Sequence, residues 1–233
     1  MGVSQVGFST ALLTMGLSLF PLAAQAIGLS TIASESELES LLSQPAFMAG
    51  GFIGTIALKA AENTENSVDF AWTQGEKQPF SLNYDGSTVK YTVGDKTLET
   101  QIQGAFNDIF IYAKAAEEST SVMIESLLLK DSSVNLTISG IAASFPNNKS
   151  SIFHIYDIGE NFTLTGNAVL NWMNTPQNSA NVGYQIQVGN VTAPTTLPVA
   201  NQNQAEPVKP SITLPNVMDW FPKLNKDSFC NVP

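Results

Sequence analysis

The stretch FSLNYDGSTVKYTVGDKTL, residues 80–98, decides the fold class. Its Asp85-Gly86 pair is a strong signal for a two-residue hairpin turn, because a type I′ turn needs φ > 0 at both central positions and these residues tolerate it. Such a turn also predicts the register of the two strands. The apolar partners across the strands are then Leu82 with Val89 and Phe80 with Tyr91.

A second tight turn at Gly94-Asp95 extends the hairpin into a meander and places Leu98 opposite Tyr91. Each strand of the meander has one apolar and one polar face. This pattern is typical of an antiparallel sheet that lies against a core on one side and faces water on the other.

The same period of two recurs along the chain. Four segments alternate between apolar and polar residues: SVDFAW (67–72), SVNLTIS (133–139), NFTLTGNAVLNW (161–172) and NVGYQIQVGNV (181–191). Three more segments are apolar on both faces and fit central strands: GFIGTIAL (51–58), DIFIYAKA (108–115) and SVMIESLLL (121–129). About nine or ten strands with turns between them predict an all-β fold, a two-sheet antiparallel β-sandwich of jelly-roll type.

The alternation also predicts which side chains face the core. Those assigned to the core are Val68, Phe70 and Trp72; Val134, Leu136 and Ile138; Phe162, Leu164, Ala168, Leu170 and Trp172; and Val182, Tyr184, Ile186 and Val188. Gly166 allows a bend or bulge in its strand. Gln185 and Gln187 fall on the opposite, polar side.

One helix is predicted, over Ser34–Gln44. Ser34 and Glu37 form a capping box, and Pro45 ends the element. Three leucines, Leu38, Leu41 and Leu42, lie at helical spacing on one face. We expect this short helix to pack on the edge of the sheet.

The composition excludes nucleic-acid binding as a function. The net charge is -10 and the pI is about 4.4, so a polyanion is repelled. The chain also contains no arginine, so the bidentate fork that binds phosphate and guanine is absent. At 233 residues and 24.9 kDa the chain is long enough for one sizeable core.

Residues 1–26 resemble a secretory signal peptide, with an apolar run and the small-residue pattern Ala24-Gln25-Ala26 before a cleavage site near Ala26. The n-region departs from the usual pattern because it has no Lys or Arg. A membrane anchor is the alternative, but Pro21 and the short apolar run argue against a span. We therefore expect a secreted or cell-surface protein without a transmembrane span in the mature chain.

The expected organisation after cleavage is a helix segment at 27–45, a sandwich domain at 46–192, a Pro/Asn/Gln-rich linker at 193–211 and a tail at 212–233. In the tail, Trp220 and Phe221 are the candidates for contact with a partner. Cys230 is the only cysteine, so no disulfide forms within one chain. It is either an unpaired thiol or a link between two chains.

Catalytic and metal-binding patterns are weak. His154 is the only histidine, so a Ser/His/Asp triad has to use it, but no G-x-S-x-G motif is present and a structural role is expected. One His and one Cys far apart do not form a usual zinc ligand set. No acid pair stands out for glycoside hydrolysis, and no D-x-D-x-D-G loop marks calcium. We expect no cofactor, with structural calcium as the alternative.

Several blocks together resemble a known family. They are SELESLLSQPAFMAGGFIGTIA, VDFAWTQGEKQPFSLNYDGSTVKYTVGDKTL, DIFIYAKA, IGENFTLTGNAVLNW and VGYQIQVGNV. In order and spacing they look like the choice-of-anchor W domain of exported, often cyanobacterial, proteins, over residues 37–191. The resemblance implies an exported β-rich domain of unassigned activity, tethered through a C-terminal segment of PEP-CTERM type. Glu206-Pro207 is similar to the Pro-Glu-Pro lead, but no apolar helix or basic end follows. The resemblance brings no catalytic residues.

These observations predict an exported, non-enzymatic sandwich with a structural or interaction role at the cell surface or in extracellular matrix. Its partner is another copy, a polysaccharide or another surface component. A carbohydrate-binding or adhesive module is the alternative, and it requires exposed Trp or Tyr side chains. An extracellular polysaccharide hydrolase is a further alternative, and it requires two convergent carboxylates, at least one of them with a raised pKa.

Overall fold

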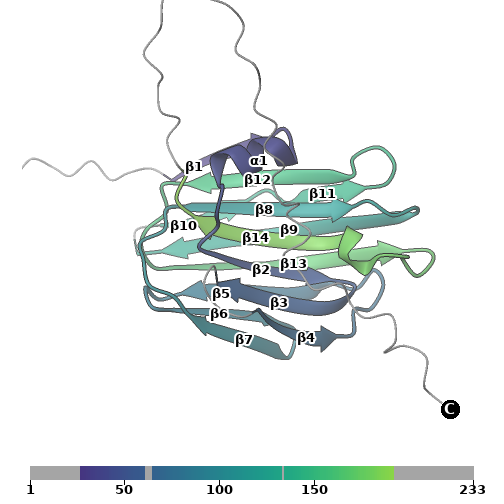
Figure 1. Cartoon of the computed structure of the whole chain (residues 1–233), viewed down its shortest axis with the longest axis horizontal. Helices are drawn as coiled ribbons and strands as arrows, with labels where there is room; N and C mark the ends of the chain where they lie inside the picture. The colour runs from purple at the N-terminus through teal and green to yellow at the C-terminus, as the bar shows by residue number, and fades with distance from the viewer. Residues whose placement is uncertain (1–26, 61–64, 133, 192–233) are drawn as a thin grey trace, which may run out of the picture.

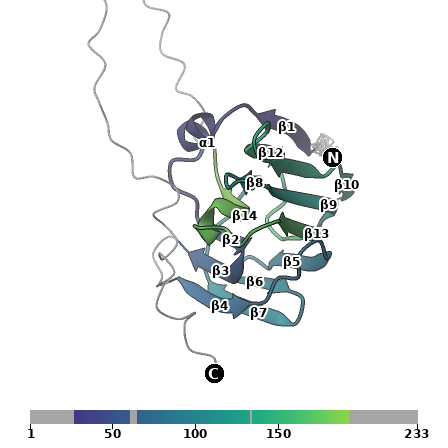
Figure 2. The ribbon, with the colours of Figure 1, turned by 90° about the vertical axis from the view of Figure 1, so that its right-hand side faces the viewer.

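The structure is a computed structural model that describes residues 27–60, 65–132 and 134–191. Figures 1 and 2 show two antiparallel sheets stacked face to face. The prediction of an all-β two-sheet antiparallel sandwich is confirmed. The predicted signal peptide, linker and tail, with Trp220, Phe221 and Cys230, lie outside the described residues.

The first sheet contains the N-terminal and C-terminal strands of the described chain. Its strands, in spatial order, are β1 (Gly28–Ile32), β12 (Ser150–Tyr156), β8 (Asp108–Ala115), β14 (Val182–Gly189), β2 (Phe47–Phe52), β3 (Gly54–Ala60) and β4 (Asn66–Phe70). Strand β1 was not expected from the sequence, because five residues with little apolar content give too weak a period. It adds to the edge of the sheet beside β12.

The second sheet contains the meander of residues 80–98. Its strands, in spatial order, are β10 (Asn135–Ile138), β9 (Thr120–Asp131), β13 (Phe162–Trp172), β5 (Gln78–Tyr84), β6 (Thr88–Val93) and β7 (Lys96–Gln101), and β11 (Ile141–Ser144) also pairs with β9. The described residues thus form fourteen strands, β1 to β14. The expected number was too low because the short strands carry too few apolar residues to be recognised.

The register predicted for the first hairpin is wrong by two residues. Tyr84 pairs with Val89, and Leu82 pairs with Tyr91. The cause lies at Asp85, whose carboxylate accepts hydrogen bonds from the backbone N–H groups of Ser87 and Thr88 at 2.9 and 2.8 Å. Asp85 therefore ends the strand, and the turn is centred on Gly86 and Ser87. A shift of two residues keeps every side chain on its predicted face.

Most of the predicted core positions are confirmed. Leu98 pairs with Tyr91 as expected. The strand β13 has a register shift between Thr165 and Asn167, where Gly166 was expected to allow a bulge. The four apolar residues of β14 are fully buried, at 0% exposure. Val134 is the exception, because it precedes β10 and is exposed.

The core is rich in aromatic side chains that reach from one sheet to the other. Phe80 of the second sheet packs on Tyr184 of the first, with ring centroids 5.3 Å apart. Trp72 lies edge-on to Tyr184 at 6.2 Å. Aromatic rings at these separations add to the free energy of area burial.

Helix α1 spans Glu35–Leu41 and begins as predicted, with Ser34 as N-cap. The Ser34 hydroxyl accepts from the Glu37 N–H at 3.2 Å, and the Glu37 carboxylate accepts from the N–H of Ala33 at 2.9 Å. Leu38 of the helix and Leu42, its C-cap, are buried and pack on Phe110 of β8 and on Ile152 of β12. The helix therefore covers the outer face of the first sheet near its β1 edge (Figure 2). No helix in the described ranges is long and apolar enough to cross a membrane.

Candidate functional site

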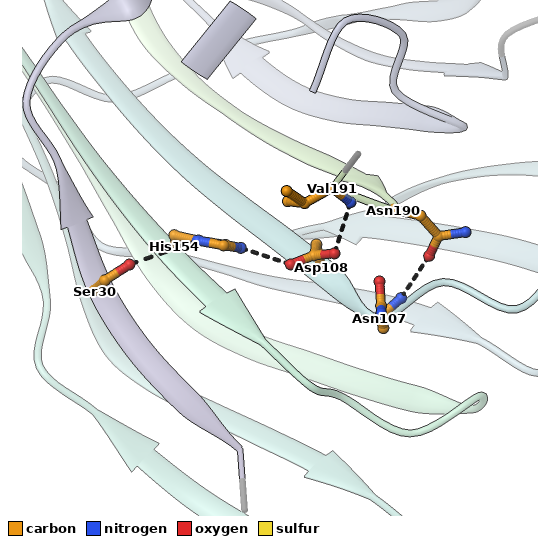
Figure 3. A network of polar contacts seen from close by, with 6 residues as sticks. All are labelled: Ser30, Asn107, Asp108, His154, Asn190 and Val191. Atoms are coloured by element: carbon orange, nitrogen blue, oxygen red, sulfur yellow. Dashed lines mark hydrogen bonds and ion pairs between the residues drawn. The ribbon is translucent and has the colours of Figure 1, made fainter. Parts of the chain in front are cut away.

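The outer face of the first sheet brings together a serine, the only histidine and an aspartate (Figure 3). Ser30 of β1 pairs with His154 of β12, and His154 pairs with Phe110 of β8. Asp108 lies two residues before Phe110, so its side chain points to the same face. Three neighbouring strands thus contribute one polar residue each.

Hydrogen bonds connect these three side chains in the order hydroxyl, imidazole, carboxylate. His154 Nε2 lies 2.7 Å from Asp108 Oδ1. Ser30 Oγ lies 3.5 Å from His154 Nδ1, at the outer limit of a hydrogen bond. His154 and Asp108 are buried, with 8% and 4% of their surface exposed.

The short bond to Asp108 selects the form of the imidazole. A carboxylate only accepts, so His154 donates from Nε2–H, and Nδ1 of the neutral ring then accepts from the Ser30 hydroxyl. The ring also stacks flat on Phe110, with centroids 4.0 Å apart and an interplanar angle of 8°. His154 is therefore held by contacts on its face and on both of its nitrogens.

The second oxygen of Asp108 holds the end of β14. Asp108 Oδ2 accepts from the backbone N–H of Val191 at 2.8 Å. Beside it, Asn190 accepts from the N–H of Asn107 at 3.1 Å and donates to the carbonyl of Ala105 at 2.9 Å. The network thus ties β1, β12 and β8 to the point where the chain leaves the sheet after β14.

This arrangement has part of the geometry of a catalytic triad. The order acid, imidazole, hydroxyl is that of the triad, but the ring nitrogens are exchanged: here Nε2 faces the acid and Nδ1 faces the serine. However, Ser30 lies inside a paired strand, and its φ is not among the positive values that a nucleophile turn requires. The long Ser30–His154 distance and the stacking on Phe110 also favour a structural role for the histidine.

The other sequence-based site hypotheses find little support. Burial raises the pKa of one carboxyl group, Glu65, and the nearby charge that opposes this shift belongs to Lys59, not to a second acid. No group of three or more His, Cys, Asp and Glu side chains in the described ranges is arranged to hold a metal ion. The alternative of structural calcium stays a prediction.

Among the Trp and Tyr side chains of the described residues, Tyr156 is 37% exposed, and the four singled out from the sequence lie in or against the core. Trp72, Tyr84 and Tyr184 are buried, and Trp172 is half-buried and packs against the same core. Their place on the apolar faces was predicted from the alternation.

The outer face of the second sheet is polar and nearly uncharged along one row. The row runs across β7, β6, β5 and β13 through Thr97, Thr92, Ser81 and Thr165, each paired with the next. We call this the hydroxyl row. Neighbouring strands are about 4.8 Å apart, and the hydroxyls of Thr92 and Thr97 are 3.0 Å apart.

Sequence reasoning missed Ser30 and Asp108 as partners of His154. Asp108 begins the apolar segment DIFIYAKA, on the same face of the strand as Phe110 and Tyr112. An acid among apolar residues on one face was the signal that it has a polar partner. Nothing in the sequence pointed to Ser30, because strand β1 itself was not recognised.

The chain matches no protein-family model, and no curated protein matches its sequence. The resemblance to the choice-of-anchor W domain stays a prediction.

Proposed function

We propose that the protein is an exported, non-enzymatic scaffold with a structural or interaction role at the cell surface or in extracellular matrix. The observation that carries this proposal is the hydroxyl row, an ordered polar surface on a rigid sheet. The core beneath it is continuous, and Trp72, Tyr84 and Tyr184 are used for packing within it.

An uncharged row of hydroxyl groups suits an uncharged polar partner. Hydroxyl groups donate and accept hydrogen bonds, so they can pair with the hydroxyls of a polysaccharide without removing a charge from water. The neighbouring row of the same face is mixed: Asn83 Nδ2 donates to the hydroxyl of Thr163 at 2.8 Å, and Lys90 and Lys130 lie at the two ends of this pair. We therefore favour a neutral matrix polysaccharide as the partner, held by many weak contacts.

The carbohydrate-binding alternative differs in how the sugar is held. A dedicated binding module stacks sugar rings on exposed aromatic side chains. Since Trp72, Tyr84 and Tyr184 are buried, a flat surface with weak, repeated contacts explains the structure better than a single sugar pocket.

Co-sedimentation of the full chain with insoluble cellulose tests the surface. Thr92→Val and Thr97→Val together remove two hydroxyls but keep the size and the β propensity of the side chains. We expect this double variant to bind about fivefold more weakly, as loss of roughly 1 kcal/mol of hydrogen bonding implies. Thr31→Val, the same change on exposed β1, is the matched control and retains binding. Equal binding by all three proteins overturns the role of the row.

Cell fractionation and the mass of the mature protein test export. We expect the protein in the medium or the surface fraction, with residues 1–26 removed. A protein that stays in the cytoplasmic fraction with Met1–Ala26 intact overturns this part of the proposal.

The second candidate function is acyl hydrolysis by Ser30, and the hydrogen-bond order with His154 and Asp108 favours it. Reaction with a fluorophosphonate probe that labels activated serines tests it. We expect no labelling in the full chain. Ser151→Ala, a change at another serine in β12, is the control. Labelling that disappears in Ser30→Ala but persists in Ser151→Ala supports the hydrolase and overturns the non-enzymatic proposal.

A further inference from the structure

Helix α1 covers only part of the outer face of the first sheet, and a separate group of side chains lies on the part that it does not cover. It consists of Met48, Phe52 and Ala57, which form a cluster of their own, together with Gly50, Gln185 and Gln187, their neighbours in the pairing of β14, β2 and β3. We call these six residues the Met48 patch. All of them point away from the core between the sheets, because the residues that alternate with them on each strand belong to that core.

The side chains of the Met48 patch are buried although they lie on the outer side of the sheet. Gln185 has 0% and Gln187 has 3% of its surface exposed, and the three apolar members range from 1% to 3%. In the described ranges, the two helical elements reach only the margins of this surface. Helix α1 packs toward β12 and β8, and the short turn η1 (Ser179–Asn181) touches β2 and β14 at one end.

One polar group in the Met48 patch has no partner. Gln187 Nε2 donates to Gln185 Oε1 at 3.2 Å, but Gln185 Nε2 is buried without a hydrogen-bond acceptor. A buried donor without an acceptor is costly. The patch therefore calls for a hydrogen-bond acceptor from whatever lies on it, and a backbone carbonyl oxygen is one such group.

The patch also offers an apolar surface beside its two glutamines. Ala57 has only a methyl group, and the ring of Phe52 lies over Gly50, 3.2 Å from where a Cβ of residue 50 would stand. Met48 and Phe52 provide apolar contacts on β2, and methionine adapts to irregular partners. An extended segment with apolar side chains and free carbonyls satisfies all of these features.

The chain itself supplies such a segment. Residues 192–233 follow Val191, which Asp108 holds at this same outer face. About 20 residues of extended chain reach roughly 65 Å, and a seven-stranded sheet is only about 29 Å wide at 4.8 Å per strand. Residues 212–221, ITLPNVMDWF, combine apolar side chains with Pro215, which has no N–H of its own to compete for acceptors.

We propose that residues 212–221 dock on the Met48 patch of the same molecule, with Trp220 and Phe221 as apolar anchors and a backbone carbonyl accepting from Gln185 Nε2. Asp219 gives the segment a negative charge, and Lys59 and Lys114 lie on the outer face at the margins of the patch. This contact is independent of the proposed matrix role, because it uses the opposite sheet.

Methionine oxidation in the full chain measures the contact. Met48 is the reporter, and Met123 and Met173, which are 38% and 79% exposed, are internal references that react in every variant. We expect peroxide to oxidise Met48 at least about tenfold more slowly than the references. Trp220→Ser with Phe221→Ser is expected to raise the rate at Met48 by about tenfold. The matched control, Lys223→Ser with Lys226→Ser, changes the same tail without removing an anchor and leaves the rate unchanged.

A change on the other side of the contact completes the test. Ala57→Lys adds a long charged side chain to the patch and points away from the core between the sheets, so the far-ultraviolet spectrum is expected to stay native while Met48 becomes reactive. If this variant fails to fold, the tail variants still decide the question. The proposal is overturned if Met48 reacts as fast as Met123 in the unmodified chain, or if loss of both anchors leaves it protected. Protection that is lost on dilution of a dimer shows that a second copy covers the patch, and it overturns docking within one molecule.

Discussion

Tyr91 of the second sheet and Tyr184 of the first meet at their hydroxyl groups in the middle of the core, 2.7 Å apart. Both side chains are fully buried, at 0% exposure. One hydroxyl donates and the other accepts, so the bond joins the two layers at a place where neither group can reach water. Apolar packing holds the sheets together, and this bond adds a preference for one relative position.

The tyrosine pair is expected to show strong coupling. Tyr91→Phe or Tyr184→Phe alone leaves the other hydroxyl buried without a partner, which costs about 1–3 kcal/mol. The double variant removes both groups and is expected to lose less than the sum of the single changes. Urea unfolding of the four proteins gives the coupling free energy of this cycle. Additive losses contradict a direct bond.

The buried tyrosines also predict how stability depends on alkaline pH. Burial raises the pKa of Tyr91, Tyr112 and Tyr184 above the ordinary value. A tyrosine whose pKa is higher in the folded state than in the unfolded state stabilises the folded state. This contribution is complete below pH 10, the approximate pKa of tyrosine in the unfolded chain, and it is lost as the pH rises further.

The expected result is a constant free energy of unfolding up to about pH 10, followed by a decline of up to 1.36 kcal/mol per pH unit for each such tyrosine. Tyrosinate absorbance and circular dichroism recorded together check this. The three buried tyrosines are expected to ionise only as the protein unfolds. Full tyrosinate absorbance from a protein with a native circular dichroism spectrum contradicts the prediction.

Substituting alanine at two glycines of the first sheet compares two kinds of steric clash. At one glycine the added Cβ meets backbone atoms, and at the other it meets a side chain. A Cβ on Gly183 would lie 2.9 Å from Phe52 Cα and also against the carbonyl of Gly51, so the strands β14 and β2 must move apart. A Cβ on Gly28 would meet the ring of Tyr156, which is 37% exposed and can swing into solvent.

Gly183→Ala is therefore expected to cost about 1–3 kcal/mol, in the range of overpacked cores. Gly28→Ala is expected to change stability by less than about 0.5 kcal/mol. Thermal and urea unfolding measure both. Equal losses in the two variants contradict the argument from backbone contact.

Asp85 is expected to stabilise the first hairpin in its ionised form. The N–H groups of Ser87 and Thr88 and the Ser87 hydroxyl donate to its carboxylate and lower its pKa. A lowered pKa in the folded state means that the contribution is present above the unfolded pKa of about 3.9 and is lost as the pH falls.

Asp85→Ala is accordingly expected to lower the melting temperature at neutral pH and to differ little from the unmodified protein below about pH 2.5. Asp95→Ala is the matched control, since Asp95 occupies the second turn of the same meander and has only a long ion pair with Lys96 at 3.7 Å. A difference for Asp85→Ala that persists unchanged in acid shows that the carboxylate charge is not the cause.

The alternation of residues was sufficient to predict the class of fold and the faces of its main strands. Phe162, Leu164, Leu170 and the apolar residues of β14 are buried as the period of two requires, because successive side chains of a strand point to opposite sides. The N-cap of α1 at Ser34 was also predicted correctly, since its signal lies within four residues of sequence. The register of the first hairpin was predicted wrongly, because the hydrogen bonds to the carboxylate of Asp85 shift the turn by one residue.

The candidate site depended on contacts between distant parts of the chain. The sequence alone determined that His154 is the single histidine and that it lies in a strand. Only the tertiary structure decided that Ser30 and Asp108 stand beside it, 124 and 46 residues away. Strand order and register place these side chains, and they result from the packing of whole sheets. Gln185 and Gln187 are a second example. The alternation in the sequence predicts that they face solvent, but in the structure they are buried, because burial depends on which other parts of the molecule lie against the sheet.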